Sequence, residues 1–216
     1  MAVQYGELKI TWLGHNGFLL EAHGKKIYVD PFQIDGREKP SADYLLITHS
    51  HYDHLSIPDI EQIITAETVV LCPPDCQSKL LKFKMKQLKT LEPGTEFEDS
   101  LLRVLAVPSY NKDKPFHPRD NDWLGYLITT AEVTVYHAGD TDLIPEMADI
   151  ECNIALLPVS GTYVMNAAEA AEAVEVIEPE IAIPMHWGAL IGTHDDAQAF
   201  KKAVGSKAKV VILEKE

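Results

Sequence analysis

The order of predicted strands and helices favours an α+β fold. We expect an αββα sandwich, in which two mostly antiparallel β-sheets pack face to face and helices cover their outer faces. Short β-rich segments dominate each half of the sequence, and helical segments stand between and after them. Of the 216 residues, 46% are hydrophobic and 24% are charged, which is an ordinary globular composition. With no internal repeat, low-complexity tract or linker, residues 1–216 are predicted to form a single domain.

The N-terminal half begins with strands. Three short β-rich runs separated by glycines open it, at residues 8–13, 18–21 and 26–30. A continuous apolar run over residues 44–48 is typical of a strand that is buried on both faces. The isoleucine spacing in residues 58–65 predicts a helix, with a proline suited to its first turn. A strand over residues 68–71 and a helix over residues 75–83 complete this half.

The C-terminal half repeats the order of strands before helices. Residues 101–107 and 123–130 are predicted strands, joined by a polar, proline-containing loop over residues 109–122. Asn166, with Glu169 three residues later, predicts the start of a helix over residues 167–177. The remaining predicted elements are strands over residues 133–137, 154–159, 181–185 and 209–213 and a helix over residues 195–204.

Charge and cysteine content restrict the partners and the compartment. The chain has 33 acidic and 19 basic residues, a formal net charge of −14, which argues against broad binding of nucleic acid or of an anionic membrane surface. No apolar run approaches the roughly 20 residues of a membrane span, and the N-terminus does not resemble a secretory signal. Cys72, Cys76 and Cys152 are an odd number of cysteines, which fits a reducing cytoplasm. We therefore expect a cytoplasmic protein that acts on a small molecule.

The sharpest feature of the sequence is a histidine cluster directly after the buried strand. Residues 48–54 read THSHYDH, so His49, His51, Asp53 and His54 lie within six residues. A strand end followed by a tight loop can direct several side chains to one point. Imidazole suits zinc, iron, nickel or copper, and a carboxylate compensates charge. Asp30 is a candidate acceptor for the second ring nitrogen of a ligating histidine, or else a turn residue before a proline.

Four motifs in order resemble the metallo-β-lactamase superfamily, and the resemblance covers nearly the whole chain. The first is the HxHxDH pattern of residues 49–54. Residues 12–15 and 29–32 are similar to the opening strands of the family, residues 136–142 to its metal-bridging aspartate motif and residues 183–186 to its final histidine motif. Residues 156–165 resemble a narrower group of small stand-alone hydrolases related to L-ascorbate-6-phosphate lactonase. A more distant similarity is to the phospholipase D that hydrolyses N-acyl-phosphatidylethanolamine.

The resemblance implies two divalent metal ions per chain, with zinc expected and manganese or iron as alternatives. His49 and His51 would bind the first ion, and Asp53, His54 and His186 the second, with Asp140 between the two. Catalysis would then depend on Asp53, Asp140 and His186.

The third histidine of the first metal ion is missing from its usual place. The strand before the long loop ends in VPSYN at residues 107–111, without a histidine. His117, in the loop over residues 109–122, is the predicted ligand because a side chain there can reach back to the strand ends. His137 shares strand parity with two valines, which suggests a core position. His137, or a missing or substituted ligand, remains the alternative.

Three further side chains are candidates for the surroundings of the site. His15 follows a glycine at a strand end and either lines the pocket or donates a structural hydrogen bond. Tyr163 and Trp187 either line a substrate pocket or belong to the core.

These assignments predict a metal-dependent hydrolase. A metal-bound hydroxide at a dinuclear site would cleave a small ester, lactone or phosphodiester. Two divalent cations, two carboxylates and a hydroxide carry about one net positive charge, which can hold an anionic substrate on an acidic chain. Two alternatives stay open: a phosphodiesterase acting on a phospholipid or nucleotide, and a non-catalytic metal-dependent ligand-binding protein. The sequence also leaves a homo-oligomer open.

Overall fold

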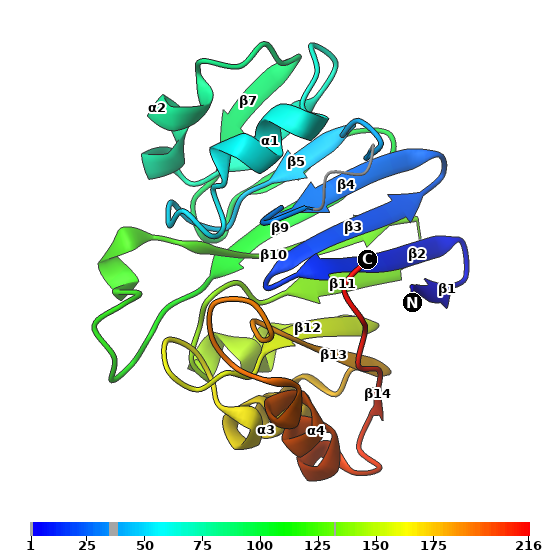
Figure 1. Ribbon diagram of the computed structural model, residues 1–216, viewed down its shortest axis with the longest axis vertical. Helices are drawn as coiled ribbons and strands as arrows, with labels where there is room; N and C mark the ends of the chain where they lie inside the picture. Colours follow the sequence, from blue (N-terminus) through cyan, green and yellow to red (C-terminus); the bar gives the residue numbers. More distant parts are fainter. Residues whose placement is uncertain (1, 35–38, 132) are drawn as a thin grey trace.

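The computed structural model describes residues 2–34, 39–131 and 133–216, which form two seven-stranded β-sheets (Figure 1). The strands of the first sheet lie in chain order: β1 (Val3–Tyr5), β2 (Leu8–Gly14), β3 (Gly17–Ala22), β4 (Lys25–Val29), β5 (Tyr44–Leu46), β6 (Val69–Cys72) and β7 (Gln87–Thr90). The second sheet lies in the reverse order, from β14 to β8: β14 (Lys209–Val210), β13 (Ile181–Met185), β12 (Ile154–Pro158), β11 (Val133–His137), β10 (Leu124–Thr130), β9 (Arg103–Pro108) and β8 (Glu96–Glu98).

Four helices complete the sandwich in this part of the chain. These are α1 (Ile57–Ile63), α2 (Gln77–Leu80), α3 (Ala167–Ile177) and α4 (His194–Val204). Figure 1 shows α1 and α2 beside the first sheet and α3 and α4 together beside the second. The predicted αββα sandwich is therefore confirmed. No helix among the described residues is long and apolar enough to cross a membrane.

The strand directions differ from the prediction of mostly antiparallel sheets. In each sheet three of the six strand pairings are antiparallel and three are parallel. Hairpins join the strands from β1 to β4 and from β8 to β11, so these neighbours run in opposite directions. From β4 and from β11 onward the chain crosses back over the sheet before each new strand, which makes the neighbours parallel.

Two hydrophobic clusters follow from the alternation of side chains along the strands. On β4, Ile27 and Val29 belong to the large cluster that also contains the inward residues of the second sheet. Tyr28 faces the other way and belongs to a smaller cluster with Ile60 of α1 and Leu80 of α2. Cys72 and Cys76 are buried in that smaller cluster, and all three cysteines of the chain are free.

Sequence patterns located most elements but missed three edge strands. These are β1, β7 and β8, which are short and mostly polar or half-exposed, so they carry no clear alternation of apolar residues. The helix expected over residues 75–83 is a 3₁₀ turn at Pro74–Cys76 followed by the single turn α2. The predicted cap of α3 is present: Asn166 Oδ1 accepts the N–H groups of Ala168 and Glu169 at 2.9 and 3.0 Å, and Glu169 Oε2 accepts that of Asn166.

Candidate metal centre

Loops from both sheets meet at one end of the sandwich. Backbone hydrogen bonds join them: the N–H of His186, after β13, donates to the carbonyl of His15 in the β2–β3 turn at 3.0 Å. The N–H of Leu124, at the start of β10, donates to the carbonyl of Thr48 at 3.0 Å. Residues that are distant in sequence are thereby held side by side at the carboxyl ends of strands, where open α/β sheets commonly bind ligands.

A first group of three histidines comes from two loops. His49 and His51 follow β5, and His49 Nε2 lies 3.0 Å from His51 Nδ1. His117 lies in the loop after β9, and the ligand atoms of the three rings lie within 4.8 Å of one another. The indole of Trp123 covers this group, with its ring centroid 4.8 Å from that of His49 and 4.7 Å from that of His51. Sequence reasoning gave Trp123 no role at the site.

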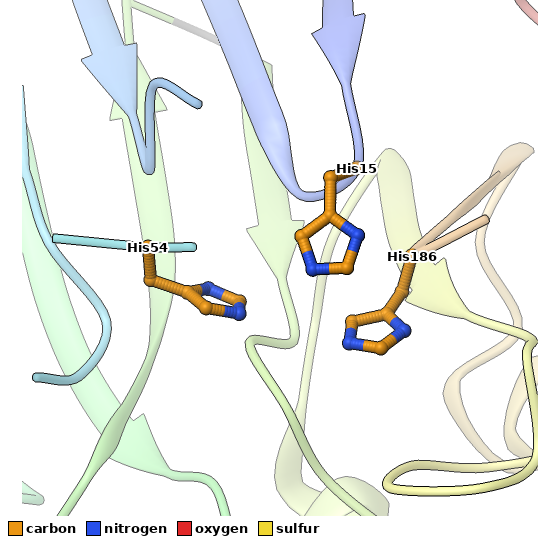
Figure 2. A group of neighbouring side chains, drawn as sticks. All are labelled: His15, His54 and His186. Carbon is orange, nitrogen blue, oxygen red and sulfur yellow. The ribbon is translucent and has the colours of Figure 1, made fainter. Parts of the chain in front are cut away.

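A second group of three histidines lies beside the first (Figure 2). His54, His186 and His15 also place their ligand atoms within 4.8 Å of one another. Figure 2 shows the rings of His15 and His186 next to each other, with His54 facing them, and the first two ring centroids are 4.2 Å apart. Asp53 Oδ2 lies 3.1 Å from His15 Nε2 and 3.8 Å from His54 Nε2, so His15 contacts the aspartate of the HxHxDH motif directly.

Asp140, in the loop after β11, lies between the two groups. Its Oδ2 atom is 3.1 Å from His186 Nε2, 3.3 Å from His117 Nε2 and 3.4 Å from His54 Nε2. Its Oδ1 atom accepts a hydrogen bond from Asn16 Nδ2 at 2.7 Å. One carboxylate oxygen is therefore within reach of ring nitrogens from both groups.

A buried carboxylate and a threonine orient two of these histidines. Asp30 Oδ2 accepts from His54 Nδ1 at 2.7 Å and from the Thr48 hydroxyl at 2.5 Å, and Asp30 Oδ1 accepts from the Thr48 N–H at 2.8 Å. Because the Thr48 hydroxyl donates to Asp30, its oxygen must accept from His49 Nδ1, which is 3.0 Å away. The Nδ1 atoms of His49 and His54 thus carry the protons, which leaves both Nε2 atoms free to bind a metal ion.

Two further side chains play the same part for His117 and His186. Asn111 Oδ1 accepts hydrogen bonds from both His117 Nδ1 and the His117 backbone N–H, at 3.1 and 3.0 Å. Asn111 Nδ2 in turn donates to Asp142 Oδ1 at 3.1 Å, which fixes its amide orientation. Ser160 Oγ lies 2.7 Å from His186 Nδ1. All four rings are therefore anchored through Nδ1, with Nε2 toward the centre.

The electrostatics of the site favour a positive charge at its centre. Burial alone would lower the pKa of His54, but the carboxylates of Asp140 and Asp30 raise it well above its ordinary value. Burial opposes ionisation of Asp140, yet His186 and His54 hold the pKa of its carboxyl well below the usual range. Burial likewise opposes ionisation of Asp53, but the hydrogen bond from His15 and the charge of His54 lower its pKa to about 2. A divalent cation would supply this positive charge and interact with both carboxylates at once.

Unpartnered nitrogen atoms also fit a metal ion. The Nε2 atoms of His54 and His117 are buried and make no well-directed hydrogen bond within the described part of the chain, although each lies 3.3–3.4 Å from Asp140 Oδ2. Imidazole nitrogens and carboxylate oxygens form the donor set of zinc, iron and related ions, so these residues fit a transition metal.

A cavity of about 430 Å³ opens onto this centre. Two aspartates and three histidines form its polar wall, and its outer wall is apolar. The lining residues are His51, Tyr52, Asp53, Phe116, His117, Asp140, Tyr163, His186, Leu190 and Ile191. The volume is at the lower end of the roughly 300–1,000 Å³ of small-molecule sites.

Two of the candidate residues from the sequence, His137 and Trp187, do not line this cavity. His137 is fully buried, and its Nε2 donates to the Asn16 carbonyl at 2.9 Å and its Nδ1 accepts from the Gly139 N–H at 3.2 Å. Trp187 does not line the cavity. Its ring packs on Trp12 with centroids 4.6 Å apart, because its N–H donates to the Pro184 carbonyl and directs the indole into the core.

Four polar residues of the site were not assigned from the sequence: Asn16, Thr48, Asn111 and Ser160. Two of them had a signal, because Asn16 and Thr48 are each adjacent to a histidine at a strand end. Asn111 stands in the segment from which the third histidine is missing, and it binds the histidine that replaces it. Ser160 follows β12 without a histidine beside it, and its hydroxyl contacts His186 across 26 residues of sequence.

Comparisons with known proteins agree with this geometry. A family model described as a beta-lactamase superfamily domain matches residues 9–186. A UPF0173 metal-dependent hydrolase of Pyrococcus furiosus is 35% identical over 221 residues, covering 95% of this chain and 96% of the relative. A crystal structure from Parabacteroides distasonis, named as a candidate metal-dependent hydrolase, has a TM-score of 0.89 at 31% identity and covers 100% of this chain and 99% of that one. A metallo hydrolase from Ignicoccus hospitalis has a TM-score of 0.77 at 27% identity, with coverage of 96% and 95%.

Proposed function

Because the chain belongs to the beta-lactamase superfamily, as its motifs predicted, and is a metal-dependent hydrolase, we propose that it cleaves a small ester, lactone or phosphodiester with the help of two divalent metal ions. Zinc is the expected ion, and manganese or iron are the alternatives. The observation that carries the proposal is the position of Asp140 Oδ2, which lies within 3.4 Å of ring nitrogens from both histidine groups. One carboxylate so placed can serve two cations.

The first ion would be held by His49, His51 and His117, and the second by Asp53, His54 and His186. Asp140 would contact both. When bound, the two cations would lower the pKa of a coordinated water toward neutrality and polarise the carbonyl or phosphoryl oxygen of the substrate.

The surrounding residues prepare these ligands for binding. Asp30, Thr48, Asn111 and Ser160 anchor the rings through Nδ1, so the Nε2 atoms need no reorientation when a cation arrives. His15 has a different part in this proposal: its Nε2–H donates to Asp53, which is ionised, and keeps that carboxylate turned toward the cavity.

Metal content and turnover test the proposal together. Purified protein should contain close to two transition-metal ions per chain by elemental analysis, and it should hydrolyse members of a panel of esters, lactones and bis(p-nitrophenyl) phosphate. Asp140→Asn should lose activity and weaken both ions, because a neutral amide cannot supply the shared charge. Asp149→Asn, on the exposed surface, is the matched control.

Each outcome separates the proposal from its alternatives. Absence of a transition metal after reconstitution, or wild-type turnover and metal content in Asp140→Asn, would contradict the dinuclear site. Hydrolysis of bis(p-nitrophenyl) phosphate without hydrolysis of lactones or carboxylic esters would restrict the substrate to phosphodiesters, and turnover of a phospholipid or nucleotide would then identify the phosphodiesterase alternative. Two bound metal ions with no turnover across the panel would identify a ligand-binding protein.

A further inference from the structure

Exposed hydrophobic side chains are concentrated around the mouth of the cavity. Seven large hydrophobic residues are exposed in the described part of the chain, and four of them line this cavity. These are Tyr52, Phe116, Tyr163 and Leu190, with exposed fractions of 68%, 41%, 37% and 47%. Together with the half-buried Ile191 we call them the apolar rim. Scattered single hydrophobic residues on a surface need no explanation, but a group of them beside a reactive site does.

The apolar rim is assembled from four loops that the fold already fixes. The rings of Phe116 and Tyr163 meet edge to face with centroids 4.6 Å apart, and Tyr52 lies against Phe32 in the same manner at 6.1 Å. Leu190 and Ile191 sit in a short turn closed by the Gly188 N–H, which donates to the Gly192 carbonyl at 3.2 Å. A rim that exists before the substrate arrives loses little conformational entropy when it binds.

That turn depends on its second glycine. Gly192 has a φ of +70°, and a Cβ atom there would lie 2.8 Å from the Cβ of Ser160. Only a residue without a side chain can therefore bring the turn this close to the loop that contacts His186, so Leu190 and Ile191 are held directly beside the metal centre.

Positive side chains are lacking where a charged substrate would need them. Among the described residues that line the cavity there is no lysine or arginine. Lys114, in the same loop as Phe116, donates to the carboxylate of Asp142 and to the Val164 carbonyl. Lys79 donates to the carbonyl of Ser50, behind the histidine cluster. An anionic arm of a substrate that extended away from the metal centre would therefore meet no lysine or arginine among the lining residues.

The apolar rim itself carries two neutral polar groups, the hydroxyls of its tyrosines. The hydroxyls of Tyr52 and Tyr163 make no hydrogen bond to any described residue, so both are available to a ligand. Tyrosine combines a large apolar ring with one such polar group. This combination fits a mainly apolar ligand that carries an ether, carbonyl or hydroxyl oxygen.

We propose that the apolar rim binds an uncharged alkyl or aryl arm of a carboxylic ester or lactone, adjacent to the bond that is hydrolysed. The inference rests on the proposed function and narrows its substrate class. In the hydrolysis, the oxygen of water bonds to the acyl carbon, the acyl C–O bond breaks, and a proton passes to the leaving alkoxide oxygen. The reaction needs no reactant besides ester and water.

A series of p-nitrophenyl esters, from acetate to octanoate, tests the rim with the zinc-loaded protein. Each added methylene should raise kcat/KM about threefold to fourfold until the cavity is filled, which corresponds to about 0.8 kcal/mol of apolar burial. Leu190→Ser should lower the octanoate-to-acetate ratio of kcat/KM about threefold to tenfold. Leu101→Ser, at a similarly exposed leucine that does not line the cavity, should leave this ratio unchanged. A hexanoate ester with a terminal carboxylate should react more slowly than its neutral counterpart, and preference for the charged ester would overturn the inference.

Calorimetric titration with n-alkyl hydroxamates measures binding without turnover. Kd should fall with each methylene in the wild type and in Leu101→Ser, and much less in Leu190→Ser. Turnover of esters without any effect of chain length on Kd or kcat/KM would refute the binding role of the apolar rim and leave the proposed function intact. An effect of chain length on Kd without turnover of any substrate would support the binding role of the apolar rim and refute the proposed function. No binding at all, or a dimer in sedimentation that Leu190→Ser dissociates, would also overturn the inference, since the rim would then be an interface between copies of the chain.

Discussion

Replacing His117 by alanine should remove one metal ion and preserve the fold, whereas replacing His137 should destabilise the fold and preserve both ions. The two histidines lie in the same half of the chain, but their contacts differ. His117 faces His49 and His51, and its Nε2 has no hydrogen-bond partner. Both ring nitrogens of His137 are already used by the backbone of Asn16 and Gly139.

The expected magnitudes follow from these contacts. Losing a hydrogen-bonded partner of a metal ligand typically weakens metal binding about 10- to 100-fold, so losing the ligand itself should cost at least about 100-fold for one ion. His137→Ala leaves the Asn16 carbonyl and the Gly139 N–H unpartnered, at about 1–3 kcal/mol each. The total of about 2–6 kcal/mol corresponds to a drop in Tm of roughly 5–20 °C for a chain of this size.

Elemental analysis after dialysis against a fixed low zinc concentration measures the stoichiometry, and thermal unfolding of the metal-free proteins measures stability. We expect one ion in His117→Ala, two in His137→Ala, and the larger drop in Tm in the latter, because it loses two hydrogen bonds to the backbone whereas His117→Ala loses one to Asn111. His23→Ala, at an exposed turn between β3 and β4, is the control that should change neither quantity. Loss of a metal ion by His137→Ala, with two retained by His117→Ala, would refute the choice of ligand and leave the dinuclear site with a different third histidine.

Three further substitutions probe the groups around the ligands. Asp30→Asn should weaken the ion at His54 about 10- to 100-fold in a chelator competition, since the amide cannot accept all three hydrogen bonds. Asn111→Ala should weaken the ion at His117 by a similar factor, and an unchanged affinity would show that the loop holds its histidine by other contacts. His15→Gln should retain two metal ions by elemental analysis, and loss of one would show that His15 is itself a ligand.

The sandwich and the candidate metal ligands could be predicted from the sequence because the pattern that indicates each of them is local. Buried strands are visible as apolar runs, and His49, Asp140 and His186 each stand in a loop after such a run. The edge strands β1, β7 and β8 were missed for the opposite reason: their residues are held by pairing with a neighbour rather than by an apolar pattern of their own. The parallel pairings depend on how the chain crosses the sheet, which no strand reveals by itself.

Contacts between distant loops were the part of the site that the sequence could predict least. Nothing local to Asn16 indicates that its side chain will meet Asp140, which is 124 residues later. Asn111 shows how a motif can change and keep its geometry. The segment that lacks the expected histidine supplies an amide oxygen instead, and that oxygen holds His117 by its ring and by its backbone. The position of a missing ligand can thus become a support for the residue that takes its place.

Three residues of the candidate centre have a left-handed backbone conformation. His15, Asp30 and His186 each come directly after a strand and have positive φ values of 51°, 43° and 60°. The left-handed region costs a residue with a side chain about 1 kcal/mol or more, and glycine adopts it without that cost. Each of the three side chains contacts the candidate centre, through Asp53, His54 or Asp140. Glycine would serve the turns better, so the retained side chains are explained by the interactions they make at the centre, and the strain is compensated by the buried hydrogen bonds around them.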